Sequence, residues 1–415
     1  MRICNGSWFG SNACVLLAGA AIAIHAPTST RAEDAAKGEI KIGNIAPYSG
    51  PASAYSAFAK TEAAYMRMLN DKGGINGRKI QFISYDDAYS PPKAVEQARK
   101  LVEQDEVLAI FQAVGTPSNA AMMKYMNIRK VPQLFSATGA TKFGDPKNFP
   151  WTMGFSPSVY RIESAIYAKY ILANYPGGKV AVLFPNDDYG RDIYGGFKDA
   201  LGAKVKTTIV AEASYDSTEP TIDSQISKLK ASGADIFVDF STPRFGALAI
   251  RKVAELGWKP VHFINTTASS ISTVFKPAGL ENAVGVMTAQ AIKEPNDPRY
   301  ADDPGVKEYL DFMKRYNPEG DVANAQNAYG FLASQVLQRV LEQCGDDLSR
   351  DNVMKQATNL KGLKFGLLFD GITINTSPTN YFPITQMQLI RFNGETFDKV
   401  GPVMSETVMQ PEARD

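Results

Sequence analysis

Short apolar runs alternate with amphipathic stretches along most of the chain, and this alternation limits the folds that the chain can adopt. Ile40–Ile45 and Val180–Phe184 have the length of strands, whereas Ser53–Asn70 and Val159–Asn174 have helical periodicity. Strands that alternate with helices predict βα units around a mostly parallel sheet. Because the series occurs once before Pro157 and again after it, we predict an α/β protein with two similar Rossmann-like lobes.

The segments after residue 290 differ from this rhythm. Val306–Tyr316 and Ala323–Cys344 predict long helices that return to the first lobe. Phe365–Ile374 and Pro383–Phe392 predict a hairpin in the second lobe, to which we also assign a strand over Val205–Ala211. The predicted division of the chain is 1–32 as a signal peptide, 38–157 with 291–364 as lobe 1, 158–290 with 365–405 as lobe 2, and 406–415 as a tail without pattern.

The first 32 residues have the features of an export signal. Arg2 is followed by the apolar run Ala13–Ile24, and Thr30-Arg31-Ala32 places small residues at the spacing of a cleavage site. The run is too short for a comfortable membrane span, and the residues before Cys14 do not fit a lipoprotein signal. We therefore expect a soluble mature protein in an exported compartment.

Charge and cysteine content exclude several classes of protein. Removal of residues 1–32 leaves 42 basic and 43 acidic residues, which provides no electrostatic attraction for nucleic acid or anionic membranes. Cys344 is then the single cysteine, so the chain must rely on a large core and not on disulfides. We expect a monomer.

The sequence contains little that suggests catalysis. It has no GxxxxGK[ST], GxGxxG, HExxH or CxxC motif, so we expect no cofactor and no metal. His262 is the one histidine outside the signal, and it begins an apolar strand. Asp86-Asp87 and Asp187-Asp188 each close a strand, where aspartates usually cap turns. These observations predict a protein that is not an enzyme, with no catalytic residues.

One stretch predicts where a ligand binds. Val131–Thr141, VPQLFSATGAT, is a strand-like run that ends in small polar residues. Open α/β sheets bind ligands at the carboxyl ends of their strands, where backbone N–H groups and hydroxyls are exposed. We therefore place the working site at this edge.

Several segments, in order, closely resemble the leucine/isoleucine/valine-binding protein family. They are IAPYSGP (45–51), LNDKGGINGR (69–78), Asp86-Asp87, Asp105-Glu106-Val107, FSATGA (135–140) and Asp188-Tyr189-Gly190. The resemblance runs from Ile40 to about Phe392. It implies a periplasmic solute-binding protein of an ABC importer with the type I periplasmic binding protein fold, in which two lobes are joined by a multi-strand hinge.

The resemblance also implies ligand-binding residues in the first lobe. Tyr55 corresponds to an aromatic that packs on the ligand, and Thr116 to a hydroxyl that binds the ligand's carboxylate. Taken alone, Tyr55 also fits lobe packing and Thr116 a helix N-cap. Ala137, Thr138 and Gly139 lie where the family offers backbone N–H groups and a threonine hydroxyl to the same carboxylate. The family's threonine is Gly139 here, with Thr138 beside it.

In the second lobe, the resemblance implies that Tyr189, Asp239 and Phe240 lie near the ligand. Thr266 aligns with a family glutamate that pairs with the ligand's ammonium group, so either Asp239 replaces that glutamate or the ligand has no ammonium. Asp239 fits a strand-end turn equally well. Tyr329 lies on a helix that returns to the first lobe, where it either lines the cleft or packs in the core.

These implications predict capture of a small-molecule carboxylate between hinged lobes and delivery to a membrane permease. The ligand is either an aromatic or other organic acid or an aliphatic amino acid. The alternative function is a ligand-sensing receptor subunit of the same fold that is coupled to a signalling partner.

Overall fold

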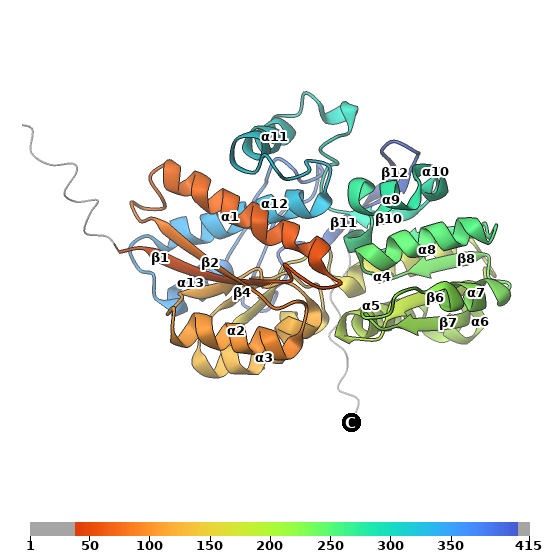
Figure 1. The fold of residues 1–415 in the computed structure, drawn as a ribbon, viewed down its shortest axis with the longest axis horizontal. Helices are drawn as coiled ribbons and strands as arrows, with labels where there is room; N and C mark the ends of the chain where they lie inside the picture. Colours follow the sequence, from red (N-terminus) through yellow and green to blue (C-terminus); the bar gives the residue numbers. More distant parts are fainter. Residues whose placement is uncertain (1–37, 406–415) are drawn as a thin grey trace, which may run out of the picture. The chain divides into compact units, whose positions relative to one another are not determined.

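The computed structural model describes residues 38–405, which contain two β-sheets flanked by helices (Figure 1). The first sheet is parallel and has the order β2-β1-β3-β4-β5. Its strands are β1 (Ile40–Ala46), β2 (Ile80–Asp86), β3 (Ala109–Phe111), β4 (Gln133–Ser136) and β5 (Thr152–Gly154). The second sheet has the order β12-β11-β10-β9-β8-β6-β7. Its strands are β6 (Val180–Pro185), β7 (Ile209–Tyr215), β8 (Ile236–Asp239), β9 (Val261–Ile264), β10 (Met287–Gln290), β11 (Gln386–Phe392) and β12 (Phe397–Ser405).

Each sheet is covered by helices that bury an apolar face. Those of the first lobe are α1 (Ser56–Asp71), α2 (Pro91–Glu103), α3 (Thr116–Arg129), α11 (Pro304–Tyr316), α12 (Ala325–Cys344) and α13 (Arg350–Ala357). Those of the second are α4 (Tyr160–Asn174), α5 (Asp188–Leu201), α6 (Val205–Thr208), α7 (Asp223–Ala231), α8 (Pro243–Glu255), α9 (Lys276–Ala278) and α10 (Leu280–Ala283). Shorter helical turns are η1 (Ser53–Tyr55), η2 (Thr141–Gly144), η3 (Gly202–Lys204), η4 (Thr266–Ala268), η5 (Ile271–Phe275) and η6 (Pro298–Tyr300). The late helix α12 packs on α1, as predicted for a helix that returns to the first lobe (Figure 1).

The α/β class with two lobes and parallel central sheets is confirmed, but one predicted strand begins too early and another is wrong. Val205–Thr208 forms the helical turn α6, and the strand begins only at Ile209, where the register with Val180 starts. Here the tight turn that follows α5 overrides the strand preference of the β-branched residues.

The predicted hairpin of Phe365–Ile374 with Pro383–Phe392 is also wrong. Residues 365–374 form isolated bridges and no strand, and Leu367 and Leu368 are buried in the core cluster of the first lobe. The partner of β11 is β12, and a turn at Asn393 joins the two strands. The exact lobe boundaries stay a prediction, but this packing favours a start near Gln386 for the last part of lobe 2. The predicted signal peptide and tail lie outside residues 38–405.

Within that described part of the chain, no helix is both long enough and apolar enough to cross a membrane. The chain passes between the two sheets after β5, after β10 and before β11. The same three crossover segments therefore lie next to strand ends of both sheets.

A buried carboxylate fixes the first of these passages to the second lobe. Glu163, in the first turn of α4, is fully buried and accepts hydrogen bonds from the Ser158 and Tyr167 hydroxyls. The backbone N–H of Thr266 donates to its Oε1 over 2.6 Å, and the Thr266 hydroxyl lies 3.0 Å from the same oxygen. Burial raises the pKa of the Glu163 carboxyl, and the donated hydrogen bonds oppose that shift. One carboxyl group therefore connects the crossover, α4 and the turn after β9.

We predict that Glu163→Ala lowers the free energy of unfolding by at least about 3 kcal/mol, because each buried donor left without an acceptor costs about 1–3 kcal/mol. Ser158→Ala removes one donor and leaves the others paired, so it should cost only about 1 kcal/mol. Urea unfolding of both variants measures the difference. Equal stability of the two variants would contradict the central role given to Glu163.

Candidate functional site

A cavity lies where loops of both lobes meet, and we call it the tyrosine cavity. Its first-lobe walls follow the carboxyl ends of β1, β2, β3 and β4, which is the edge that parallel sheets use for ligands. The lining residues are Tyr55, Phe58, Tyr89, Val114, Gly115, Thr116 and Ala137 from the first lobe, Ser156 and Pro157 from the crossover, and Tyr160, Tyr189 and Thr267 from the second lobe.

Aromatic rings dominate the wall of the cavity. The Tyr55 ring stacks on Tyr89 with centroids 6.4 Å apart, and the Tyr160 ring meets Tyr189 edge-on at 4.8 Å. Burial raises the pKa of all four phenols, so they stay neutral at physiological pH. The Tyr55 hydroxyl also makes a hydrogen bond with Thr267 of the other lobe. The cavity therefore suits a flat apolar body held between neutral hydroxyl groups.

A pair of threonines provides polar contacts at one end. The Oγ1 atoms of Thr116 and Thr138 lie 2.8 Å apart, and Thr116 Oγ1 is 3.3 Å from the Tyr160 hydroxyl. Thr116 is the first residue of α3 and does not act as its N-cap, since Gly115 holds that position. The positive end of the helix dipole faces this hydroxyl cluster, which favours a negatively charged group there.

The backbone near Ala137 does not offer all the donors that the family resemblance implies. The N–H of Ala137 donates to Ala113, and the N–H of Thr138 donates to Ser136. At Gly139 a β-carbon would lie 1.9 Å from the Ser158 carbonyl oxygen, so the crossover occupies the space that the family's threonine would need. The hydroxyl at this edge therefore comes from Thr138.

Tyr89 is held against the cavity in a strained conformation. It has a φ of +60°, and the preceding Ala88 has a φ of +49°, a region that side chains other than glycine rarely adopt. A β-carbon on Gly115, whose own φ is +99°, would lie 2.4 Å from Cε2 of the Tyr89 ring. Gly115 is thus required both by its backbone angle and by the close approach of the ring.

Of the ten predicted site residues, the structure brings Tyr55, Thr116, Ala137 and Tyr189 together in the cavity wall. Thr138 contacts Thr116 just behind the wall, and the Gly139 carbonyl accepts from the Tyr160 N–H. The Tyr189 hydroxyl is buried and meets no hydrogen-bonding partner within residues 38–405. This orphaned group gives the cavity one polar atom without a protein partner.

The other predicted residues lie away from the wall. Asp239 is buried under α8, where Oδ1 accepts from the Ser241 N–H and Oδ2 lies 3.6 Å from His262 Nε2. Phe240 packs on Phe197 in the core of the second lobe. Thr266 is bound to Glu163, and its neighbour Thr267 lines the cavity instead.

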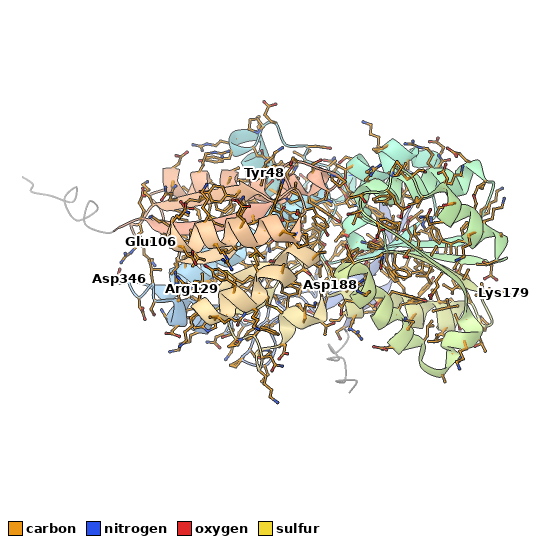
Figure 2. The ribbon with its side chains drawn as sticks, turned by 60° about the horizontal axis from the view of Figure 1, so that its bottom comes forward. Tyr48, Glu106, Arg129, Lys179, Asp188 and Asp346 are labelled. Carbon is orange, nitrogen blue, oxygen red and sulfur yellow. The ribbon has the colours of Figure 1, made fainter. Side chains whose placement is uncertain are left out.

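Tyr329 and the paired aspartates have structural partners. The Tyr329 hydroxyl donates to Gln290 Oε1 over 2.9 Å. Asp86 accepts from turn N–H groups, and Asp187 caps α5 at Gly190. Asp188, labelled in Figure 2, pairs with Lys142 at 2.9 Å. Across residues 38–405, no three His, Cys, Asp or Glu side chains are grouped as metal ligands would be.

Sequence reasoning missed eight lining residues, namely Phe58, Tyr89, Val114, Gly115, Ser156, Pro157, Tyr160 and Thr267. A usable signal existed for Tyr89, which follows the end of β2 as Tyr55 follows the end of β1. Tyr160 and Thr267 depend on how the crossover and the turn after β9 fold back, which no local pattern shows.

Known proteins match this chain over nearly all of its described length. A family model described as "Periplasmic binding protein" matches residues 39–396. The Leu/Ile/Val-binding protein homolog 3 of Brucella melitensis is 26% identical over 325 residues, which are 75% of this chain and 81% of that protein. The Leu/Ile/Val-binding protein BraC3 of Rhizobium johnstonii is 26% identical over 334 residues, which cover 79% and 84%.

Solved structures share the fold. A branched-chain amino acid ABC transporter protein from Thermus thermophilus with bound valine has a TM-score of 0.80 at 16% identity, covering 90% of this chain and 98% of that one. A solute-binding protein of an ABC transporter from Rhodopseudomonas palustris, in complex with 3,4-dihydroxybenzoic acid, has a TM-score of 0.73 at 19% identity, covering 88% and 97%. The chain therefore belongs to the periplasmic binding proteins of the Leu/Ile/Val-binding type, with their two-lobed type I fold.

Proposed function

We propose that this protein is the exported solute-binding component of an ABC importer, and that its ligand is a small aromatic carboxylate bound in the tyrosine cavity. The observation that carries the proposal is the composition of the wall, which combines aromatic rings and hydroxyls with no charged side chain. An aromatic body packs on the rings, and the carboxylate binds at the Thr116 hydroxyl beside the N-terminus of α3.

The absence of a carboxylate among the lining residues argues against an α-amino acid. Leaving a buried ammonium group without an anionic partner costs about 2–5 kcal/mol, which is about 30-fold to several-thousand-fold in affinity. Asp187 and Asp239 are the carboxylates that could supply the charge. The charge of Asp187 acts on Tyr55 and Tyr89, but Asp187 caps α5 at Gly190, Asp239 is buried beside His262, and neither is a lining residue. An aliphatic amino acid is the second candidate, and the bound valine of the Thermus thermophilus relative supports it.

Closure of the two lobes explains how a neutral wall can hold an anion. Residues of both lobes line the cavity, so a ligand that contacts both favours the closed arrangement by its differential affinity. Exclusion of water strengthens each hydrogen bond to the carboxylate. The closed protein would then deliver its ligand to a membrane permease, without chemical conversion. Recovery of a chemically changed ligand after incubation with purified protein would overturn the claim that no conversion occurs.

A thermal-shift screen tests the ligand class. Benzoate and hydroxybenzoates should raise the melting temperature, whereas leucine, valine and the neutral benzamide should not. A ligand present at a hundred times its Kd adds ~2.7 kcal/mol to the free energy of unfolding, which such a screen detects readily. If only zwitterionic amino acids stabilise the protein, the aromatic-acid proposal is wrong and Asp239→Asn becomes the next variant to test.

We predict that Thr116→Val weakens binding of a carboxylate ligand found in that screen by about 10- to 100-fold, because a hydrogen bond to a charged group contributes about 1.5–3 kcal/mol. Titration calorimetry measures the change. Thr358→Val is the matched control, since that threonine is also buried but bonds only to the backbone of α13, far from the cavity. Unchanged affinity in Thr116→Val would remove the carboxylate contact from the proposal.

We predict that Gly115→Ala abolishes ligand binding, because the new methyl group would push the Tyr89 ring into the cavity. Gly177→Ala is the control, since Gly177 has a comparable φ of +81° but open space around its Cα. Both variants should lose about 1 kcal/mol of stability through backbone strain, whereas only Gly115→Ala should lose affinity. Equal affinities in a binding titration would show that Tyr89 does not shape the site.

A further inference from the structure

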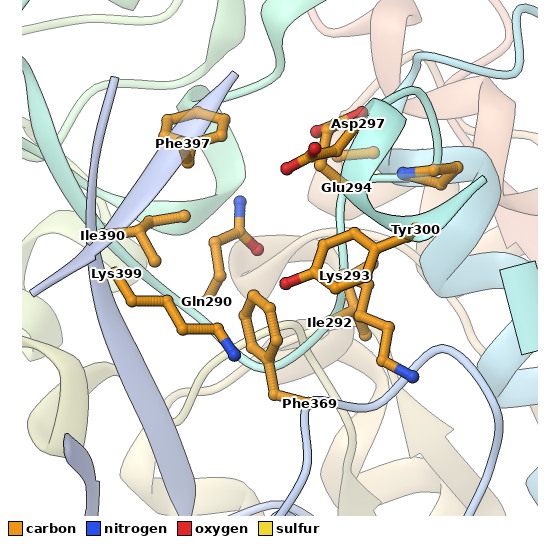
Figure 3. A pocket seen from close by; sticks show the side chains of 12 residues that line it. Gln290, Ile292, Lys293, Glu294, Asp297, Tyr300, Phe369, Ile390, Phe397 and Lys399 are labelled. Atoms are coloured by element: carbon orange, nitrogen blue, oxygen red, sulfur yellow. The ribbon is translucent and has the colours of Figure 1, made fainter. Parts of the chain in front are cut away.

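A second cavity lies beside two of the passages between the lobes, and we call it the crossover cavity (Figure 3). It shares no lining residue with the tyrosine cavity. The segment after β10 forms one wall, and β11, β12 and the loop that carries Phe369 form the others. The lining side chains that matter here are Gln290, Glu294, Tyr300, Phe369, Phe397 and Lys399.

Glu294 gives this cavity a polar atom that lacks a partner. Its Oε1 is buried and accepts no hydrogen bond within residues 38–405, and the carboxyl group points into the cavity (Figure 3). Burial raises the pKa of this carboxyl to about 8, and the nearby carboxylates of Asp297 and Asp321 add to the shift, whereas a hydrogen bond from the Asn296 backbone opposes it. The carboxyl group is therefore protonated below about pH 8, and above that pH its unmatched oxygen is an acceptor in a negative local field.

The other charged groups of the wall are already engaged or exposed. Asp297 accepts from Arg299 and from the Thr396 hydroxyl. The Lys293 ammonium group donates to Asp303 over 2.7 Å and to the Gly366 carbonyl. Lys399 is exposed, with its Nζ 4.9 Å from the centre of the Phe369 ring, so solvent screens its charge.

Aromatic side chains complete the wall opposite Glu294. The rings of Tyr300 and Phe369 lie 6.5 Å apart, and Phe397 lines the same space. A carboxyl oxygen combined with aromatic faces is the environment that recognises organic ammonium groups, through a charge-assisted hydrogen bond and cation–π attraction. Once Glu294 has lost its proton, above about pH 8, a ligand whose own group is an acceptor would leave its Oε1 unmatched.

We propose that the crossover cavity is a second binding site, for a small organic ammonium compound whose N–H group donates to Glu294 Oε1. This site does not depend on the ligand of the tyrosine cavity. The two are connected through Gln290, which accepts from the Tyr329 hydroxyl and donates to the Ser269 hydroxyl over 2.9 Å. Ser269 in turn donates to the Thr266 carbonyl, next to the lining residue Thr267.

The pH dependence of binding follows from the chemistry of Glu294. Its carboxyl group must lose a proton when an ammonium group binds, so affinity should rise by up to about tenfold per pH unit until the pH reaches about 8. Above that pH the affinity should stay level until the probe itself loses its proton. The other titratable groups around it are Asp297, Asp321, Lys293, Lys399, Tyr300, Tyr309 and Tyr329, and none of these has to change protonation for the probe to bind.

Methylammonium chloride, titrated into the mature full-length protein and followed by NMR chemical shifts, tests the proposal. We expect saturable binding that strengthens as the pH rises toward about 8. Glu294→Gln should weaken binding at least tenfold. Glu308→Gln, which changes an exposed glutamate of α11, should leave it unchanged.

Two results would overturn the proposal. One is the lack of saturable binding in the parent protein at every pH tested, and the other is equal affinity in Glu294→Gln and the parent. Melting curves establish whether Glu294→Gln is folded. If the variant is not folded, the parent protein provides the test. A methylammonium affinity that does not change as the pH rises toward about 8 excludes Glu294 as the binding partner.

Discussion

The Glu163 carboxyl group is the constraint on which the geometry of the tyrosine cavity depends. It lies in the first turn of α4, directly after the crossover that carries Ser156 and Pro157, and it accepts a hydrogen bond from the backbone N–H of Thr266, which follows β9. Tyr160 and Thr267 are each within a few residues of these contacts and face the ligand space. A buried carboxyl surrounded by donors therefore fixes both second-lobe walls without touching the cavity.

In the first lobe, the walls of the tyrosine cavity are fixed by close packing against two glycines. Ser158 packs on Gly139 so tightly that no side chain fits, and Tyr89 packs on Gly115 in the same way. Close packing at these two glycines lets the crossover and a strained loop come near the strand ends. The hydroxyl pair of Thr116 and Thr138 is then left at the edge, beside the N-terminus of α3.

The contrast between strand ends, which follow from local sequence, and contacts between distant segments explains what could be predicted from the sequence. The alternation of strands and helices predicts the sheets, and the ends of parallel strands predict the edge at which a ligand binds. The family resemblance implies Tyr55, Thr116 and Ala137 at that edge. The role of Thr266 could not be predicted, since its partner is Glu163, 103 residues earlier in the chain. The strand predicted over residues 365–374 was wrong for a related reason. The apolar side chains of this segment fill the first-lobe core, and the segment does not form a strand.

The positions of charged groups also explain how such a fold can change its ligand. In this chain the Glu163 carboxyl group, near the turn after β9, accepts hydrogen bonds from internal donors. Asp239, the other carboxyl group considered for the ligand's ammonium, lies beside His262. Neither carboxylate is a lining residue of the cavity, so the proposed ligand would be recognised through neutral groups alone. The proposed selectivity for simple acids over zwitterions then rests on the structural use of both carboxyl groups and needs no change in the sheets or crossovers.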